Sequence, residues 1–178
     1  MDQRLPFSAT QLSRPYEALS ELPVSILLDN VRSMYNVGSF FRTGNACAIN
    51  EILLAGITST PERNPKQIAK TALGAEHTVR WRYAADPLEL LPSGMEIAAI
   101  ETTPRAVDLF DWQPHFPVCI LFGHEVEGLR PELSARADVH IRIPMLGSKH
   151  SLNVATAGGV VLYELLRKYR RLLESHPY

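Results

Sequence analysis

Short runs of mostly apolar residues recur along this chain, and each is followed by a polar loop. Runs of this length are typical of strands that are buried in a parallel sheet, and they fall at residues 23–30, 51–56, 78–83, 96–103, 117–123 and 139–145. Apolar residues at helical spacing fall between and after them, at residues 36–49, 65–76 and 151–174, with shorter helical turns at 86–91 and 128–137. Strands that alternate with helices predict an α/β fold with a mostly parallel sheet flanked by helices.

Residues with restricted backbones or short polar side chains predict where these elements begin and end. Asn36 is a suitable N-cap for the first helix, and Pro65 suits the first position of the second. Pro144 cannot donate to a sheet, so the preceding strand should stop near it. Ser148 or Ser151 can cap the last helix. An apolar stripe predicts the packed face of that helix; it consists of Val154, Ala157, Val161, Leu165, Tyr169 and Leu172.

The composition is that of an ordinary globular protein, with 46% apolar and 21% charged residues among 178. This length predicts a single domain at residues 23–178, preceded by a polar N-terminal arm at residues 1–22. No apolar run approaches the roughly 20 residues of a membrane span. Cys47 and Cys119 each lie in an apolar run, which predicts buried, reduced thiols and a cytoplasmic location. The six histidines form no ligand pair at helical spacing, so no metal site is expected.

The net charge of −1 conceals an uneven distribution along the chain. Residues 81–148 carry five Lys or Arg against ten Asp or Glu, whereas residues 149–178 carry five against two. The basic C-terminal segment has two interpretations. Its cations can complement the dipole of the last helix, which is preferred when the segment is considered alone, or they can contact an acidic partner.

Polar clusters follow four of the predicted strands, at residues 29–36, 101–103, 123–128 and 147–153. The carboxyl ends of parallel strands meet at one edge of a sheet, and ligands bind in the crevice beyond that edge. The four clusters are therefore expected to form a binding site.

Three of these segments resemble, in order, the three motifs of the SpoU (TrmH-like) family, the RNA 2′-O-ribose methyltransferases of the SPOUT superfamily. They are NVRSMYNVGSFFRT at residues 30–43, LFGHEVEGL at 121–129 and IPMLGSKHSLNV at 143–154. The third departs from the common pattern, since Ala155, Thr156 and Ala157 follow where the family often has Ser-Val-Ala. The resemblance covers roughly residues 24–170.

The resemblance implies a homodimer, a C-terminal trefoil knot and S-adenosyl-L-methionine as methyl donor. Topology rules alone would favour an unknotted, doubly wound sheet. The family's donor-binding positions correspond to Thr102, Gly123, Ile143, Met145 and Leu152. Gly123 permits close backbone approach, and the apolar members offer walls for the donor. From periodicity alone, Ile143 and Leu152 would be assigned to the core.

The resemblance also implies a set of catalytic residues, namely Arg42, Asn36, Glu125, Ser151 and Asn153. A guanidinium holds its proton above a pH of about 12, so Arg42 is expected to grip an RNA phosphate and polarise the ribose oxygen rather than to act as a base. Asn36, Ser151 and Asn153 can orient the ribose and the donor, although helix capping is an equally good account of Ser151. Glu125 is expected to hold its loop or Arg42 in place.

The implied partner is a folded RNA, with tRNA preferred over rRNA and with no role for DNA or a membrane. Phosphate contacts are expected from exposed cations, which are Arg14, Arg32, Arg63, Lys66, Lys70, Lys149 and the cluster at residues 167–171. The alternative is a non-catalytic RNA-binding module on the same fold, and a metal hydrolase is a weaker third reading.

Overall fold

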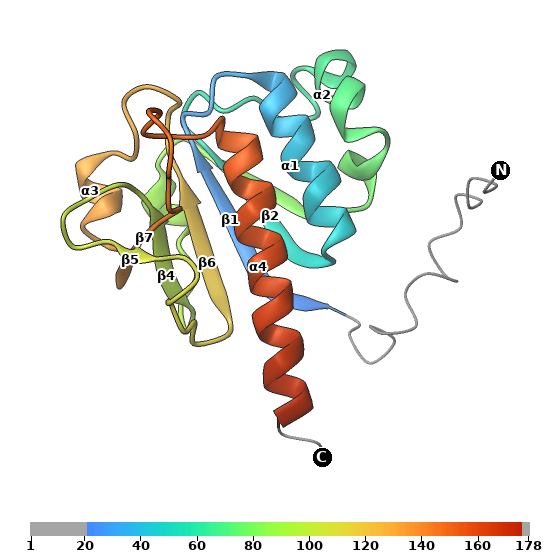
Figure 1. Cartoon of the computed structure of the whole chain (residues 1–178). Helices are drawn as coiled ribbons and strands as arrows, with labels where there is room; N and C mark the ends of the chain where they lie inside the picture. Colours follow the sequence, from blue (N-terminus) through green and yellow to red (C-terminus); the bar gives the residue numbers. More distant parts are fainter. Residues whose placement is uncertain (1–20, 176–178) are drawn as a thin grey trace, which may run out of the picture.

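The computed structural model describes residues 21–175, which fold around a seven-stranded sheet (Figure 1). Every pair of neighbouring strands is parallel, and the strand order is β3-β2-β1-β6-β4-β7-β5. The strands are β1 (Leu22–Asp29), β2 (Ile49–Ala55), β3 (Trp81–Ala84), β4 (Glu96–Ile100), β5 (Val107–Asp108), β6 (Val118–Phe122) and β7 (Val139–Arg142). This confirms the predicted α/β fold. The two-residue edge strand β5 was not predicted, because it is too short to leave a pattern.

Helices cover both faces of the sheet. On one face lie α1 (Met34–Ala46), α2 (Pro65–Ala72) and α4 (Val154–Ser175), as Figure 1 shows. The other face is covered by shorter turns, namely η4 (Pro87–Leu90) and α3 (Pro131–Ser134), while η3 (Ala75–His77) follows α2. Within residues 21–175 no helix is long and apolar enough to cross a membrane.

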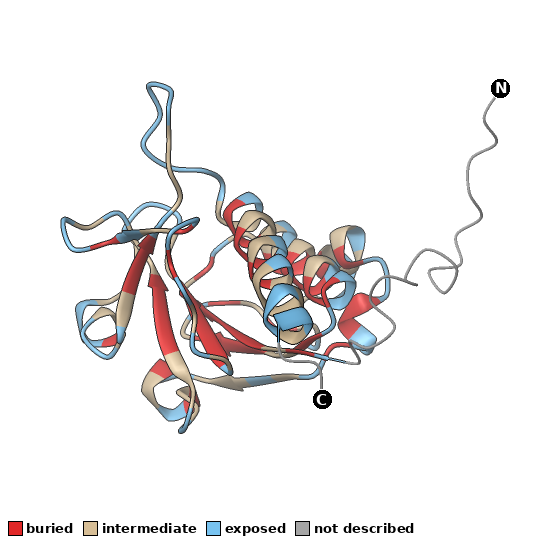
Figure 2. Ribbon diagram, turned by 60° about the horizontal axis from the view of Figure 1, so that its bottom comes forward, coloured by how far each residue is buried: buried red, intermediate tan, exposed pale blue. Residues whose placement is uncertain are grey.

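Successive residues of a strand point to opposite faces of the sheet, so the buried strands feed two apolar cores. In β1, Ile26 and Leu28 join the core beneath α1 and α4, whereas Leu27 joins the core beneath α3 and η4. Figure 2 shows the buried strands between helices whose outer faces are exposed. Cys47 and Cys119 are buried and free, as predicted, and burial raises the pKa of each thiol to about 12.

Two predicted helix caps are wrong. Ser33, rather than Asn36, is the N-cap of α1, and its hydroxyl accepts the backbone N–H of Asn36 at 3.3 Å. For α4, Asn153 replaces the predicted serines, and its Oδ1 accepts the N–H groups of Ala155 at 3.0 Å and Thr156 at 3.2 Å. Both differences arise because the loop geometry places another short polar side chain within reach of the first turn.

The packed face of α4 is the predicted one except at its end, where Leu172 is 44% exposed. The basic cluster on this helix also has a structural role. Lys168 is nearly buried, and its ammonium donates to the backbone carbonyls of Leu109, Phe110 and Trp112. Arg167 and Arg170 pair with glutamates one turn away. These three cations therefore satisfy partners within the chain, which weakens the expectation that they contact RNA.

Adjacent glycines in α4 have opposite surroundings, and we expect alanine to have opposite effects at them. A Cβ at Gly158 would meet the buried Phe40 ring at 2.2 Å, whereas one at Gly159 would meet nothing within 4 Å. Overpacking at position 158 should lower the free energy of unfolding by about 1–3 kcal/mol. At position 159, replacing a helical glycine should raise it by about 0.5–1 kcal/mol. Urea unfolding of both variants tests this, and equal effects would contradict it.

Two predictions remain outside these observations. The N-terminal arm lies outside the described residues apart from Glu21 and Leu22, the second of which begins β1. The strand order does not test the threading of the C-terminal segment, so the trefoil knot stays a prediction.

Candidate functional site

A cavity of about 400 Å³ opens beyond the carboxyl ends of β4, β6 and β7 and reaches the first turn of α4. Its walls come from the segments at residues 100–102, 122–128, 141–145 and 150–157. Three of the four polar clusters found in the sequence therefore meet here. The arrangement follows from the parallel sheet, which brings strand ends that are distant in sequence to one edge.

All five residues expected to bind the donor line this cavity: Thr102, Gly123, Ile143, Met145 and Leu152. Ile143 is half-buried and packs against the main core, and Leu152 is 37% exposed. The core assignment suggested by periodicity therefore applies in part to Ile143 and not to Leu152. The structure thus brings the five positions together, while their contacts with a donor stay predictions.

The loop after β6 is fixed by backbone contacts and by one acidic side chain. His124 and Gly128 exchange backbone hydrogen bonds at 3.0 and 2.9 Å. A Cβ at Gly123 would lie 2.3 Å from the carbonyl carbon of Gly128, so only glycine fits this turn. Glu101 accepts the N–H of Leu129 at 2.6 Å and also lines the cavity. Glu101 belongs to the polar cluster at residues 101–103 that was expected at this edge, although no role was assigned to it from the sequence.

A chain of hydrogen bonds joins the three motif segments at one side of the cavity. The Glu125 carboxylate accepts the backbone N–H groups of Arg32 and Ser33, both at 3.1 Å, and the Asn36 amide, also at 3.1 Å. The side-chain oxygen of Asn36, Oδ1, in turn accepts a hydrogen bond from the side-chain amide of Asn153 at 3.1 Å. Glu125 therefore anchors the N-terminus of α1, where a negative charge is favourable. Asn153 connects this chain to the N-terminus of α4.

These bonds keep Glu125 ionised. Partial burial acts to raise its pKa, but the N–H groups of Arg32, of Glu125 itself and of Ser33, together with the Asn36 amide, outweigh burial and hold the pKa below its ordinary value of 4.5. A lowered folded-state pKa contributes stability above the unfolded-state value, and this stability is lost as the pH falls through the folded-state value.

We therefore expect Glu125→Gln to melt at a lower temperature than the wild type at neutral pH. The difference should shrink as the pH falls below the ordinary carboxyl pKa of 4.5, because the wild-type carboxylate then takes up its proton. Melting curves of both proteins across this range test the expectation. A difference that is constant with pH would show that the carboxylate charge does not stabilise the α1 terminus.

Two expected catalytic residues lie apart from this hydrogen-bonded chain. Ser151 lines the cavity and is exposed. Arg42 is exposed on α1, two turns after Asn36, and is not among the residues that line the cavity. Among the described residues its guanidinium has no hydrogen-bond or ion-pair partner. The prediction that Glu125 holds Arg42 in place is therefore wrong, and Glu125 holds the start of α1 instead.

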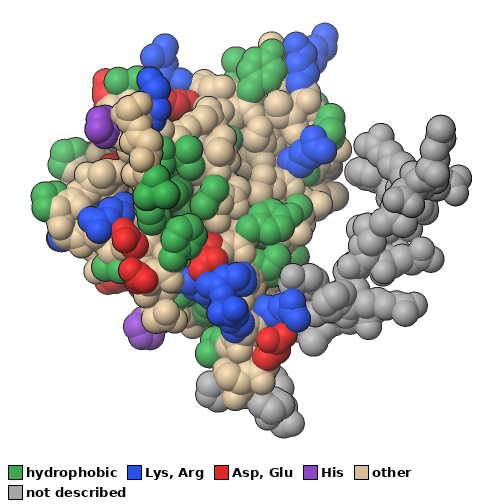
Figure 3. All heavy atoms as spheres, in the orientation of Figure 1, with side chains coloured by type: hydrophobic (Ala, Val, Ile, Leu, Met, Phe, Trp, Pro, Cys, Tyr) green, Lys and Arg blue, Asp and Glu red, His purple; other side chains and the backbone are tan. Residues whose placement is uncertain are grey.

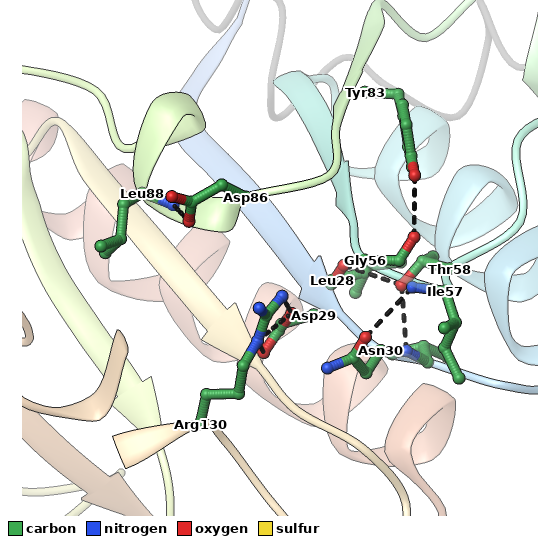
Figure 4. A network of polar contacts seen from close by, with 11 residues as sticks. Leu28, Asp29, Asn30, Gly56, Ile57, Thr58, Tyr83, Asp86, Leu88 and Arg130 are labelled. Atoms are coloured by element: carbon green, nitrogen blue, oxygen red, sulfur yellow. Dashed lines mark hydrogen bonds and ion pairs between the residues drawn. The ribbon is translucent and has the colours of Figure 1, made fainter. Parts of the chain in front are cut away.

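A second polar network lies at the ends of β1 and β2 (Figure 4). The Asp29 carboxylate is fully buried, and Arg130 donates to it through Nε and Nη2 at distances from 2.5 to 3.1 Å. Asn30, with a φ of 57°, accepts the N–H of Ile57 at 3.1 Å. The ion pair joins β1 to the segment after the cavity loop. Sequence analysis did not find it, because its members are 101 positions apart and no local pattern connects them.

The cavity combines apolar walls with carboxylate side chains. Ile100, Phe122 and Ile141 add apolar wall beyond the predicted residues, and Glu101 and Glu127 add carboxylates. Apolar walls with a few placed polar groups are typical of cofactor sites. Carboxylates beside such walls favour a positively charged ligand.

Comparison with known proteins relates the chain to RNA-modifying enzymes. The tRNA (guanosine(18)-2′-O)-methyltransferase of Escherichia coli K12 is 32% identical over 149 residues, which cover 82% of this chain and 63% of that enzyme. The structure of an AdoMet-bound rRNA methyltransferase from Sinorhizobium meliloti superposes with a TM-score of 0.74 at 30% identity, covering 81% of this chain and 56% of that one. A TrmH/SpoU tRNA modifying enzyme from A. aeolicus gives 0.75 at 26% identity, with 94% and 87% covered.

The chain spans about three fifths of the length of the first curated relatives that it matches, 61% and 63%. The model of the SpoU rRNA methylase family matches residues 23–163, which include all three motifs and every strand after the first residue of β1. By this match, the chain belongs to the SpoU rRNA methylase family.

Proposed function

We propose that this protein transfers a methyl group from S-adenosyl-L-methionine to a ribose 2′-hydroxyl of RNA. The observation that carries the proposal is a single cavity at the carboxyl edge of the sheet, which all five expected donor-binding residues line. The chain of bonds from Glu125 through Asn36 to Asn153 lies at the same cavity. The AdoMet-bound relative from Sinorhizobium meliloti supports this assignment of the donor.

When bound, the donor supplies an electrophilic methyl group on a sulfonium. The Asn36 and Asn153 amides and the Ser151 hydroxyl are neutral, and we propose that they orient the ribose so that its 2′-oxygen lies in line with the methyl carbon. The transfer would join the 2′-oxygen to the methyl carbon, release S-adenosyl-L-homocysteine as the leaving group and give the hydroxyl proton to water. We propose that the Arg42 guanidinium stabilises the negative charge that develops on the 2′-oxygen, without giving up its own proton.

We propose tRNA as the substrate class, with rRNA second. The A. aeolicus relative, of which this chain covers 87%, is named a tRNA modifying enzyme, and the Escherichia coli relative is named for a tRNA position. The rRNA methyltransferase from Sinorhizobium meliloti is a longer chain, of which 56% is covered. The match therefore extends over more of the A. aeolicus tRNA enzyme than of the Sinorhizobium meliloti rRNA enzyme.

The purified protein should transfer label from S-[methyl-³H]adenosylmethionine to unfractionated tRNA more efficiently than to rRNA. Nuclease digestion should then place the label on a 2′-O-methyl nucleoside. Absence of label from both pools would count against a methyltransferase. Calorimetry with the donor distinguishes the alternative, because a catalyst should bind the donor and a non-catalytic RNA-binding module need not.

We also propose a cytoplasmic homodimer. Two apolar side chains near the cavity project into solvent, namely Leu146, fully exposed, and Val126, 85% exposed. Exposed apolar side chains of this kind are typical of surfaces that another protein chain covers. Sedimentation should show a dimer, which replacing Leu146 by serine should weaken. A monomer at all concentrations would exclude it.

A further inference from the structure

The exposed surface of α2 and the loop before it carries positive charge beside aromatic rings. We call Arg63, Lys66, Lys70 and Tyr35 the α2 surface; all four are exposed. Residues 57–74 contain these three cations and one acid, Glu62. Figure 3 shows Lys and Arg side chains next to hydrophobic ones at the end of the molecule where Figure 1 labels α2. The surface is therefore locally basic on a chain whose net charge is −1.

Two of the three cations of this surface contact aromatic rings. The Arg63 guanidinium lies 4.4 Å from the centre of the Tyr83 ring, and the Lys70 ammonium lies 5.8 Å from the centre of the Tyr35 ring. Within residues 21–175, no ion pair to an acid involves Arg63, Lys66 or Lys70. Arg167 and Arg170 of α4, by contrast, are paired with glutamates. The positive charge of the α2 surface is therefore not neutralised by an acidic side chain among residues 21–175, and it can attract an anionic ligand.

The helix α2 packs closely against α1, the helix that carries Asn36. The Thr71 hydroxyl of α2 donates to the Tyr35 carbonyl of α1 at 2.9 Å. A Cβ at Gly38 would lie 2.3 Å from the Ile68 carbonyl oxygen, so the two helices touch through their backbones. Tyr35 directly precedes Asn36, whose amide joins Glu125 and Asn153 at the cavity. Tyr35 therefore lies one residue along α1 from a member of the hydrogen-bonded chain, on the helix that α2 packs against.

We propose that the α2 surface binds an unpaired RNA segment next to the target nucleotide, with Tyr35 stacking on a flanking base and Lys66 and Lys70 contacting phosphates. Exposed aromatic rings stack on splayed-out bases, and unpaired cations follow the phosphate backbone. A fully paired helix keeps its bases stacked inside and offers Tyr35 nothing to stack on. The inference rests on the proposed function and narrows its substrate to RNA with an unpaired loop at the site of methylation.

Binding measurements on the full-length chain test this, with unfractionated tRNA and a fully paired RNA duplex as probes. Tyr35→Ala should weaken tRNA binding by about 5- to 150-fold, the range of one lost base stack, and Tyr35→Phe should restore it. Lys66→Ala and Lys70→Ala should each reduce the slope of log affinity against log salt by about 0.7. Arg136→Ala, an exposed cation far from α2, is the matched control and should change neither.

Donor affinity, measured by calorimetry, separates this inference from the proposed function. If the donor binds and methyl transfer proceeds while Tyr35→Ala and Lys70→Ala bind tRNA as the wild type does, the inference is overturned and the function stands. If the donor does not bind but these variants lose tRNA, the inference stands without the function. If Tyr35→Ala lost affinity equally for tRNA and for the duplex, the stacking role of Tyr35 would be overturned. A wild-type protein that binds neither RNA would overturn the whole inference.

Discussion

Changing Arg42 to alanine should lower methyl transfer by about 100- to 1,000-fold and leave donor affinity unchanged. The expected loss is that of one group that stabilises charge in a transition state. Arg42 lies outside the cavity of its own chain, so donor binding does not depend on it. Single-turnover transfer to tRNA and calorimetry with the donor measure the two quantities separately. Arg42→Lys should recover only part of the rate, because an ammonium lacks the planar fork of a guanidinium.

The position of Arg42 also raises the question of which cavity it serves. One hypothesis is that, in the proposed homodimer, Arg42 of one copy serves the cavity of the second. Dimers formed from Arg42→Ala and Ser151→Ala chains would then contain one site with both residues intact, and mixing two inactive variants should restore activity. No recovery in mixed dimers would restrict Arg42 to its own chain. Full activity of Arg42→Ala would remove it from the mechanism.

Changing Arg130 to methionine should lower the free energy of unfolding by about 3–5 kcal/mol, because it leaves the fully buried Asp29 carboxylate without its partner. For a domain of this size, that loss corresponds to a fall in melting temperature of roughly 6–20 °C. Because the Arg130 side chain is 31% exposed, water can reach Asp29 after the substitution, and the loss should then lie near the lower value. Urea unfolding and thermal melts measure it.

A double variant provides the control for this loss. Asp29→Asn combined with Arg130→Met removes both charges, so it should recover much of the stability that Arg130→Met loses. Asp29→Asn alone should destabilise less than Arg130→Met, because a partly exposed guanidinium can turn to solvent. A loss below about 1 kcal/mol in Arg130→Met would mean that water reaches Asp29 once the arginine is gone.

Sequence patterns gave the order and approximate bounds of the main strands and helices, since each long element buries a continuous apolar run or stripe. The sequence patterns did not predict the short elements correctly. The strand predicted at residues 78–83 begins at Trp81, because residues 75–77 continue the helical turn as η3. The N-cap of α1 was also predicted wrongly. Ser33 and Asn36 are both plausible N-caps, and only the approach of Glu125 distinguishes them.

The sequence by itself determined the alternation of buried strands and amphipathic helices, and the residues that would gather at the carboxyl edge of the sheet. Local periodicity is sufficient for this, because burial of each segment depends mainly on its own side chains. Only the tertiary structure decided which polar groups meet. The pairing of Asp29 with Arg130, the bond from Asn153 to Asn36 and the separation of Arg42 from the cavity depend on contacts between distant segments. A polar side chain has several possible partners of similar energy, and the packing of the two cores selects the one within reach.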